Sequence, residues 1–281
     1  MAEIIADADA PTPVQERGGL LFKREDLYAP FGSGDVNGGK ARQCCKLLEA
    51  VGPSSVYTAC SIHSPQAPIV AAFARARGVP ATILYGGTSA DRLRSMQMPR
   101  LCMAHGAKLV IAARTGRHNV LGAIAHRMAD EAGGFVVDYG INVERYPGVM
   151  LDAVSRQVEN LPDEAPELHM VCGSGITASG VLMGVKRYRK RIGKVVLYAT
   201  APDRSERLRG NVGRFPCDVE VVDLFHRKGF VYERREPLTA FGISFHPNYE
   251  AKMMRELLTR RRPPEGSVVW IVGAEPSRCF R

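Results

Sequence analysis

The sequence predicts an α/β fold with mostly parallel sheets. Short apolar runs with high β-propensity alternate along the chain with amphipathic helical patterns, and glycines follow several of these patterns. Strands that alternate with helices favour parallel pairing through right-handed crossovers. The 281 residues, 45% hydrophobic and 24% charged, have the composition of an ordinary globular protein with a substantial core.

The elements of the first half follow from periodicity and from stop signals. Gly78 ends one helical pattern, and Pro99 lies inside another, which we expect to be kinked or broken there. In chain order, the pattern predicts a helix that begins at Lys40, strands at 55–59, 80–85, 108–111 and 135–137, and helices at 66–77, 91–105 and 119–132.

The second half continues the same alternation. Its strands are apolar runs that lead into glycine-rich or polar turns, and its helices carry apolar residues at helical spacing. We expect helices at 147–161, 176–190 and 247–260, and strands at 168–172, 195–200, 219–224 and 268–272. These strand lengths and glycine stops favour two α/β layers over a single sheet.

The chain has a formal net charge of +9, and basic residues cluster at 186–191, 204–209 and 260–262. One interpretation is attraction to phosphates, in nucleic acid or in a small cofactor. The alternative, which we favour for each cluster alone, is that cations at helix C-termini complement the helix dipole. A nucleic-acid partner is therefore an open but not a favoured prediction.

Seven cysteines show neither CxxC spacing nor a paired framework. Free cysteines in apolar runs are typical of a reducing compartment, so we expect a cytoplasmic protein without a metal site. No apolar run has the length of a membrane span, and the first residues lack the pattern of a secretory leader.

The most informative segment surrounds Lys40, which directly follows Gly38 and Gly39 and opens a helical pattern. A lysine in the first turn of a helix lies at the positive end of the dipole, which together with burial favours the neutral amine. A neutral amine is a nucleophile that can hold a carbonyl cofactor as a Schiff base. The alternative is a solvated lysine after a glycine-rich turn.

A second motif, VCGSGITASGVLMG, occupies residues 171–184. An apolar strand leads into a glycine-rich turn and then into a helix, so backbone N–H groups and hydroxyls meet at a helix N-terminus. This arrangement predicts an anion site, although it has neither the lysine of a nucleotide P-loop nor GxGxxG spacing. The alternative is a tight turn with a helix cap.

Together the two motifs resemble the fold type II pyridoxal-phosphate enzymes, the tryptophan synthase β-like family. The nearest branch is that of 1-aminocyclopropane-1-carboxylate deaminase and D-cysteine desulfhydrase. The similarity follows the order of the chain through six segments. They are a TPL-like element at 12–14, KREDL at 23–27, a GGNKxRKLEFL-like helix at 37–48, an IQSNQ-like loop at 62–66, a GSGGTxAG-like turn at 173–180 and a DPVYxGK-like element at 247–252.

The resemblance implies pyridoxal 5'-phosphate as the cofactor and assigns roles to residues. Lys40 holds the cofactor as a Schiff base and acts in catalysis with Ser64 and Tyr249. Ser64 and Gln66 bind the substrate. The cofactor-binding residues are Lys40, Gly173, Ser174, Gly175, Ile176, Thr177 and, facing the pyridine nitrogen, Glu275, with Ser277 as the alternative at that position.

The resemblance also implies two three-layer α/β domains with mostly parallel sheets, and a homodimer. The expected large cofactor-binding domain comprises residues 1–53 and 146–281, and a small domain of residues 54–145 is inserted in it.

The implied reaction is that of a lyase or deaminase acting on an amino acid or amino-acid-like amine. Two alternatives stay open. The net positive charge of the chain and the altered substrate loop at 62–66 suit a substrate in which an amino acid is attached to a nucleobase in DNA. Pro65 and Ile176, which replace an asparagine and a glycine of the family, instead suit a catalytically degenerate protein that binds or regulates.

Overall fold

The computed structural model describes residues 7–141, 146–232 and 234–277. They form two compact α/β units, each built on its own sheet. One unit, which we call the four-stranded unit, contains residues 29–147 and the described ends of the chain. The other, which we call the six-stranded unit, contains residues 9–28 and 148–275.

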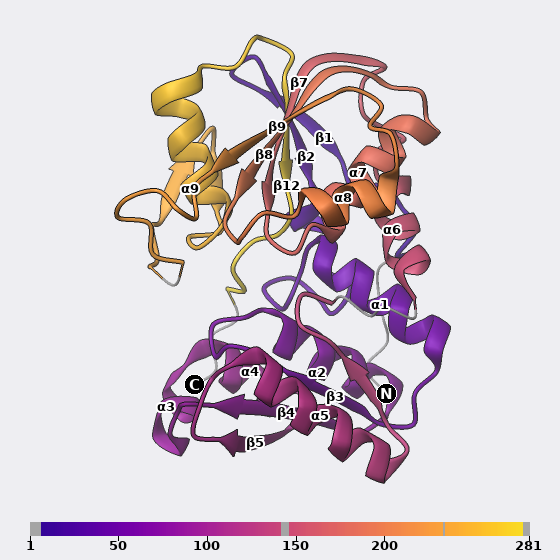
Figure 1. Cartoon of the computed structure of the whole chain (residues 1–281), viewed down its shortest axis with the longest axis vertical. Helices are drawn as coiled ribbons and strands as arrows, with labels where there is room; N and C mark the ends of the chain where they lie inside the picture. Colours follow the sequence, from indigo (N-terminus) through magenta and orange to yellow (C-terminus); the bar gives the residue numbers. More distant parts are fainter. Residues whose placement is uncertain (1–6, 142–145, 233, 278–281) are drawn as a thin grey trace. The chain divides into compact units, whose positions relative to one another are not determined.

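The six-stranded sheet is parallel except at one edge, where β1 pairs antiparallel with β2. Hydrophobic strand residues alternate between two cores, so that Val195 and Leu197 face one core while Val196 and Tyr198 face the other. The strand order is β1 (Val14–Arg17), β2 (Leu20–Arg24), β12 (Val268–Ile271), β7 (Glu164–Cys172), β8 (Arg191–Ala199) and β9 (Asp218–Asp223) (Figure 1).

Helices cover both faces of this sheet (Figure 1). The first core receives side chains from α6 (Pro147–Arg156), α7 (Ile176–Arg187) and α8 (Ser205–Val212). The second receives them from α9 (Glu250–Glu256) and from the hairpin of β10 (Leu238–Ala240) and β11 (Ile243–Phe245).

The four-stranded sheet is entirely parallel. Tyr57 and Ala59 of its strand β3 face the core that α5 covers. Thr58, between them, accepts a hydrogen bond at its Oγ1 from Gln66 Nε2 at the start of α2. The strand order is β5 (Lys108–Ala113), β4 (Ala81–Gly86), β3 (Val56–Ala59) and β6 (Phe135–Val137). The helices are α1 (Gly39–Val51), α2 (Gln66–Arg77), α3 (Ala90–Ser95), α4 (Gln97–Ala104) and α5 (His118–Ala132).

The predicted α/β class with mostly parallel sheets is confirmed, and several element boundaries differ. The helix expected at 91–105 is two helices that part at Met96, while Pro99 lies in the first turn of α4, where its missing N–H breaks no helical bond. The last helix begins at Glu250 and ends in a π-helical turn at Leu257–Arg261. Helix α8 and the β10–β11 hairpin are additional short elements.

The compact units and the predicted domains differ mainly in one segment, and also at residues 7–8, 146–147 and 276–277. Residues 29–53 were expected in the large domain, but α1 packs against α2 and groups with the four-stranded sheet. The predicted boundary at residues 145 and 146 adjoins segment 142–145, which lies outside the described residues. The domain boundaries therefore stay a prediction. Among the described helices, none is long and apolar enough to cross a bilayer.

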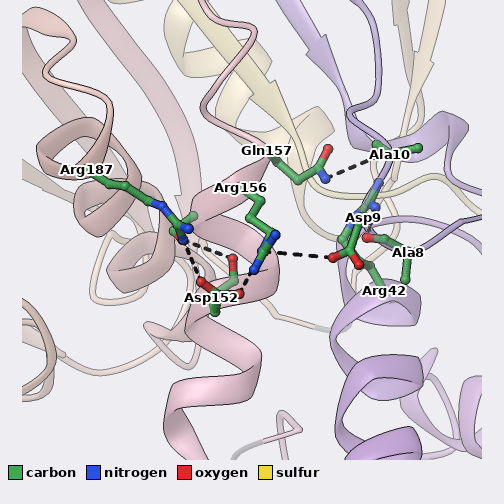
Figure 2. Close-up of polar contacts among 9 residues, drawn as sticks. Ala8, Asp9, Ala10, Arg42, Asp152, Arg156, Gln157 and Arg187 are labelled. Carbon is green, nitrogen blue, oxygen red and sulfur yellow. Dashed lines mark hydrogen bonds and ion pairs between the residues drawn. The ribbon is translucent and has the colours of Figure 1, made fainter.

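An acidic residue of α6 links this helix to its neighbours, as Figure 2 shows. Asp152 accepts hydrogen bonds from Arg156 at 2.7 Å and from Arg187 of α7 at 2.6 Å. Burial alone would raise the pKa of Asp152, but these two guanidinium groups lower it below its usual range. Gln157 donates to the Ala10 carbonyl at 3.3 Å, which attaches the N-terminal segment to the end of α6.

We predict that Gly184→Ala destabilises the protein by about 1–3 kcal/mol, because helix α7 packs closely on α6. A Cβ at Gly184 would lie 2.4 Å from Val158 Cγ2 and 2.6 Å from the Ser155 carbonyl oxygen. Gly122 of α5 has nothing within 4 Å of the same position, so Gly122→Ala should stabilise by up to about 1 kcal/mol. Urea unfolding of both variants measures the difference, and an equal response of the two would contradict the close packing.

Candidate active site

Most of the predicted site residues lie where parallel strands end. Ser64 follows β3, the glycine-rich turn of residues 173–175 follows β7, and Glu275 follows β12. Because parallel strands all end at the same edge of their sheet, the loops of each unit gather at one edge. The remaining predicted residues lie at the starts of helices: Lys40 in α1, Gln66 in α2, Ile176 and Thr177 in α7, and Tyr249 at α9.

Lys40 lies in the first turn of α1, as the sequence predicted. The helix is preceded by Gly38 with φ 90°, a conformation that favours glycine. A buried pair holds the loop before it, because His105 Nε2 lies 3.0 Å from Asp35 Oδ1 and the same oxygen accepts the Val36 N–H at 2.7 Å. The entry to the helix is therefore held by buried polar contacts.

The structure brings Lys40 and Ser64 to the same thiol. Burial raises the pKa of the Cys60 thiol to about 12. Three smaller effects lower this pKa: hydrogen bonds from the Ala67 backbone and the Ser64 hydroxyl, and the positive charge of Lys40. Ser64 Oγ also accepts the Gln66 N–H at 3.3 Å, which is a helix-start contact. Two predicted catalytic residues thus surround one buried cysteine at the end of β3.

Gln66, predicted to bind the substrate, makes a set of contacts within this unit, and its role toward a substrate stays a prediction. Its side chain is buried, and its Nε2 donates to Thr58 Oγ1 at 2.7 Å and to the Asp138 carbonyl at 2.9 Å. Its Oε1 accepts the N–H groups of Gly140 at 2.7 Å and of the following residue. These contacts use the hydrogen-bonding capacity of the amide, which joins α2 to the loop after β6.

The glycine-rich turn of the six-stranded unit has the geometry of an anion site. Gly175 has φ 88° and caps α7, whose first N–H groups have no partner within the helix. Arg204 Nε donates to the Gly173 carbonyl at 3.3 Å, and Arg207 donates to the Ser174 carbonyl at 2.9 Å. Contacts to the carbonyl groups hold the turn and place two positive charges beside it.

Thr200 is a residue of this site that the sequence analysis missed. It directly follows β8 and is 1% exposed, and its hydroxyl has no hydrogen-bond partner among the described residues. A Cβ built on Gly173 would lie 4.0 Å from Thr200 Oγ1, so the hydroxyl is a neighbour of the turn. A buried hydroxyl without a partner is costly, and an anion at the turn would satisfy it. Its position directly after a buried strand is the only sequence signal.

Tyr249 is held within a group of aromatic side chains. Tyr232 Oη donates to Tyr249 Oη at 3.0 Å, and the ring centroids lie 5.8 Å apart. The His246 ring lies 4.6 Å from the Tyr249 ring. Lys252 Nζ bonds to the Val231 carbonyl at 2.7 Å and to the Tyr232 carbonyl at 3.0 Å. Tyr232, which the sequence analysis missed, is thereby fixed against the predicted catalytic tyrosine.

Glu275, predicted to face a pyridine nitrogen, is bound by both terminal nitrogens of Arg235, one of them at 2.8 Å. A second carboxyl group lies near the end of the same strand. Glu250 is 2% exposed, its Oε1 accepts the Val272 N–H at 3.0 Å, and its Oε2 has no partner among the described residues.

Burial raises the pKa of Glu250 to about 7. Hydrogen bonds from the backbone at Glu250, Val272 and Gly273 only partly offset this effect, and the charge of Asp26 adds to it. A buried carboxyl group that titrates near neutrality is typical of functional sites. The only sign of Glu250 in the sequence is its position directly after Tyr249 and before the apolar residues of α9.

We predict that Glu250 makes stability depend on pH. The unfolded carboxyl group titrates near pH 4.5 and the folded one near pH 7, so the folded state retains a proton that the unfolded chain has lost. Stability should therefore fall as the pH rises through this range, by on the order of 3 kcal/mol. Glu250→Gln, which stays neutral, should remove this dependence, as urea unfolding at each pH can measure.

The exposed Glu206 of α8 provides the control. Glu206→Gln should retain the pH dependence of the unmodified protein. If Glu250→Gln and Glu206→Gln gave the same profile, the raised pKa would be contradicted.

Comparisons with known proteins agree with this architecture. No family model matches the chain. The O-seryl-dTMP PLP-dependent decarboxylase of Salmonella phage ViI is 24% identical to it, over 92% of this chain and 78% of that protein.

Solved structures share the fold at low sequence identity. An ACC deaminase homologue superposes with a TM-score of 0.74 at 18% identity, over 98% of this chain and 92% of the other. Maize serine racemase superposes with a TM-score of 0.62 at 18% identity, over 100% of this chain and 96% of the other. The chain therefore has the architecture of the fold type II pyridoxal-phosphate-dependent enzymes, which confirms the resemblance and the fold class inferred from its motifs.

Proposed function

We propose that the chain is a pyridoxal-phosphate-dependent lyase that acts at Cα of an amino acid or amino-acid-like amine. The observation that carries the proposal is Lys40 in the first turn of α1, after a left-handed glycine, on a fold type II scaffold. Lys40 is partly buried, and its amine is the nucleophile that would attack the carbonyl carbon of the cofactor.

The six-stranded unit fits the phosphate ester of this cofactor. The N–H groups at the start of α7 and the hydroxyls of Ser174 and Thr177 supply donors. The buried Thr200 hydroxyl has no acceptor in the part of the chain that the structure describes. Ile176 would contribute only its backbone, because its side chain is 2% exposed and packs in the interior. The charges of Arg204 and Arg207 at the turn favour a dianion.

Glu250 fits the role of a partner for the pyridine nitrogen. Its carboxyl group is buried at the end of β12, and one oxygen lacks a donor. A carboxyl group with a pKa of about 7 can share a proton with a ring nitrogen of similar basicity. We propose Glu250 for this role ahead of Glu275, which would first have to leave Arg235.

Pyridoxal phosphate, when bound, withdraws electrons from the bond that breaks at Cα. Lys40 Nζ would hold the cofactor covalently and, with the substrate bound, would hold the proton that leaves or reaches Cα. The Ser64 hydroxyl binds the substrate carboxylate. Tyr249 Oη acts as an acid or base, and the hydrogen bond from Tyr232 stabilises its deprotonated form.

A second candidate function narrows the substrate to an amino acid attached to a nucleotide, with loss of its carboxylate as the reaction. The supporting observation is the similarity to the phage O-seryl-dTMP decarboxylase along 92% of this chain. The net charge of +9 agrees with a partner that carries phosphates. In this reaction the Cα–carboxylate bond breaks, carbon dioxide leaves, and Lys40 Nζ supplies the proton that Cα gains.

Two further parts of the proposal concern setting and assembly. The six cysteines among the described residues are free thiols, five of them buried, which supports a reducing cytoplasmic compartment. The homodimer rests on the resemblance to the family.

We predict that Lys40→Ala abolishes the visible absorbance of the cofactor-loaded protein and the covalent cofactor adduct after borohydride reduction, because the adduct requires this amine. Mass spectrometry of peptides locates the adduct. Lys46→Ala on the same helix is the control and should keep both signals. An adduct elsewhere in the chain, or none in the unmodified protein, would refute the assignment.

The reaction type is tested with cofactor-loaded protein and a panel of D- and L-amino acids, free and as esters of thymidine nucleotides. A decarboxylase releases carbon dioxide and an amine, whereas a deaminase releases ammonia and a keto acid. We expect carbon dioxide from a nucleotide-linked amino acid and at least tenfold slower turnover of free serine, because remote binding contributes to rate. Turnover of none of these compounds would favour the degenerate binding protein.

A further inference from the structure

We propose that a recess at the carboxyl ends of β4 and β5 binds a phosphate group of the DNA strand that carries the substrate. This inference rests on the second candidate function, in which the substrate is an amino acid attached to a nucleotide. The recess lies wholly within the four-stranded unit and contains none of the residues assigned to the cofactor or to catalysis.

The recess has a volume of about 680 Å³, which is the size range of small-molecule sites. Two segments form it. The first is residues 87–89, which leave β4 and lead into α3, together with Arg92 of that helix. The second is residues 111–113 at the end of β5 and Arg114, which follows the strand. None of these lining residues is acidic.

Glycines build the close approach of these two segments. A Cβ on Gly86 would lie 2.0 Å from the Thr115 carbonyl oxygen, and one on Gly87 would lie 3.0 Å from the Gly116 nitrogen. Any larger residue would push the two loops apart. Backbone packed against backbone therefore holds the two segments that line the recess close together.

Two positive charges of the recess are not neutralised. Arg92 and Arg114 are exposed, and within the part of the chain that the structure describes neither guanidinium has a hydrogen-bond or ion-pair partner. The nearest acid along α3 is Asp91, which pairs with Arg94 at 2.8 Å. Thr88 Oγ1 is a further polar atom, which is buried and has no hydrogen-bond partner in residues 7–141, 146–232 and 234–277. These groups are all available to an anion.

The chemistry of these groups selects a phosphate ester. Guanidinium groups bind phosphate oxygens in a bidentate, planar manner, and a hydroxyl supplies a further hydrogen bond. The volume of the recess exceeds that of a single phosphate ion and accommodates a nucleotide unit. An exposed pair of arginines at the rim suits a strand that enters from solvent and continues beyond the recess.

The recess lies on the same sheet edge as the predicted catalytic residue Ser64. Strands β3 and β4 are parallel neighbours, and Ser64 is in the loop that follows β3. Neighbouring strands lie about 5 Å apart, so the recess is roughly 10 Å from the Ser64 loop. That span suits a substrate whose amino acid reacts at Lys40 and Ser64 while a phosphate of the strand is held at Arg92 and Arg114.

The test measures binding of a fluorescein-labelled single-stranded thymidine oligonucleotide to the cofactor-loaded protein by anisotropy. The double variant Arg92→Gln/Arg114→Gln should weaken binding at least about tenfold at low salt. It should also reduce the slope of log affinity against log salt by roughly 1.4, the value for two contacts to a single strand.

The matched control is Lys108→Gln/Arg127→Gln, which removes the same charge from exposed positions outside the recess. It should retain most of the affinity and the slope of the unmodified protein. If the unmodified protein does not bind the oligonucleotide, or if both double variants bind equally, the inference is overturned. Thr88→Val, which removes only the buried hydroxyl, should weaken binding without changing the salt slope.

Competition identifies the source of the phosphate. Displacement of the oligonucleotide by dTMP would assign the site to a free nucleotide, and failure of dTMP would assign it to the strand; either result places a nucleotide phosphate in the recess. Equal displacement by inorganic phosphate would overturn the inference in favour of a simple anion site. The borohydride adduct on Lys40, measured in the same preparations, separates failure of this site from failure of the proposed enzyme.

Discussion

The parallel pairing of strands is the constraint on which the rest of the structure depends. In both sheets the pairing of β3 with β4 and of β7 with β8 directs consecutive loops to one edge. The glycine-rich turn, Thr200 and Glu250 meet at or near strand ends of the six-stranded unit. Ser64 and the arginine-lined recess meet at the edge of the four-stranded unit. Packing of the two sheet faces holds these edges in place.

Buried polar groups separate the residues that support the site from those that serve a ligand. The amide of Gln66 and the Asp35–His105 pair are surrounded by partners within the chain, so they stabilise loops. By contrast, Thr200 Oγ1 and Glu250 Oε2 are buried and lack a partner among the described residues. Leaving such atoms unsatisfied costs free energy, and a bound cofactor would repay it through hydrogen bonds. This contrast is the physical basis for assigning their roles.

Sequence patterns predicted the helices and strands that have strong hydrophobic periodicity. They misplaced a helix break and missed a hairpin whose strands are too short for a periodic pattern. Helix α2 and its glycine stop at Gly78 follow from apolar spacing and are confirmed. Pro99 suggested a break, yet the break is at Met96, because proline is tolerated in a first turn. The β10–β11 hairpin has strands too short for a periodic signal, and packing against the second core stabilises it.

The sequence by itself determined the fold class, the position of Lys40 in the first turn of a helix and the glycine-rich turn before α7, because glycine spacing and hydrophobic period are local properties. Only the tertiary structure decided which polar side chains are saturated and which are not. It showed that the Gln66 amide supports a loop, and it revealed Thr200, Tyr232 and Glu250. The burial and the partners of these atoms depend on segments far apart in the chain, which no local pattern records.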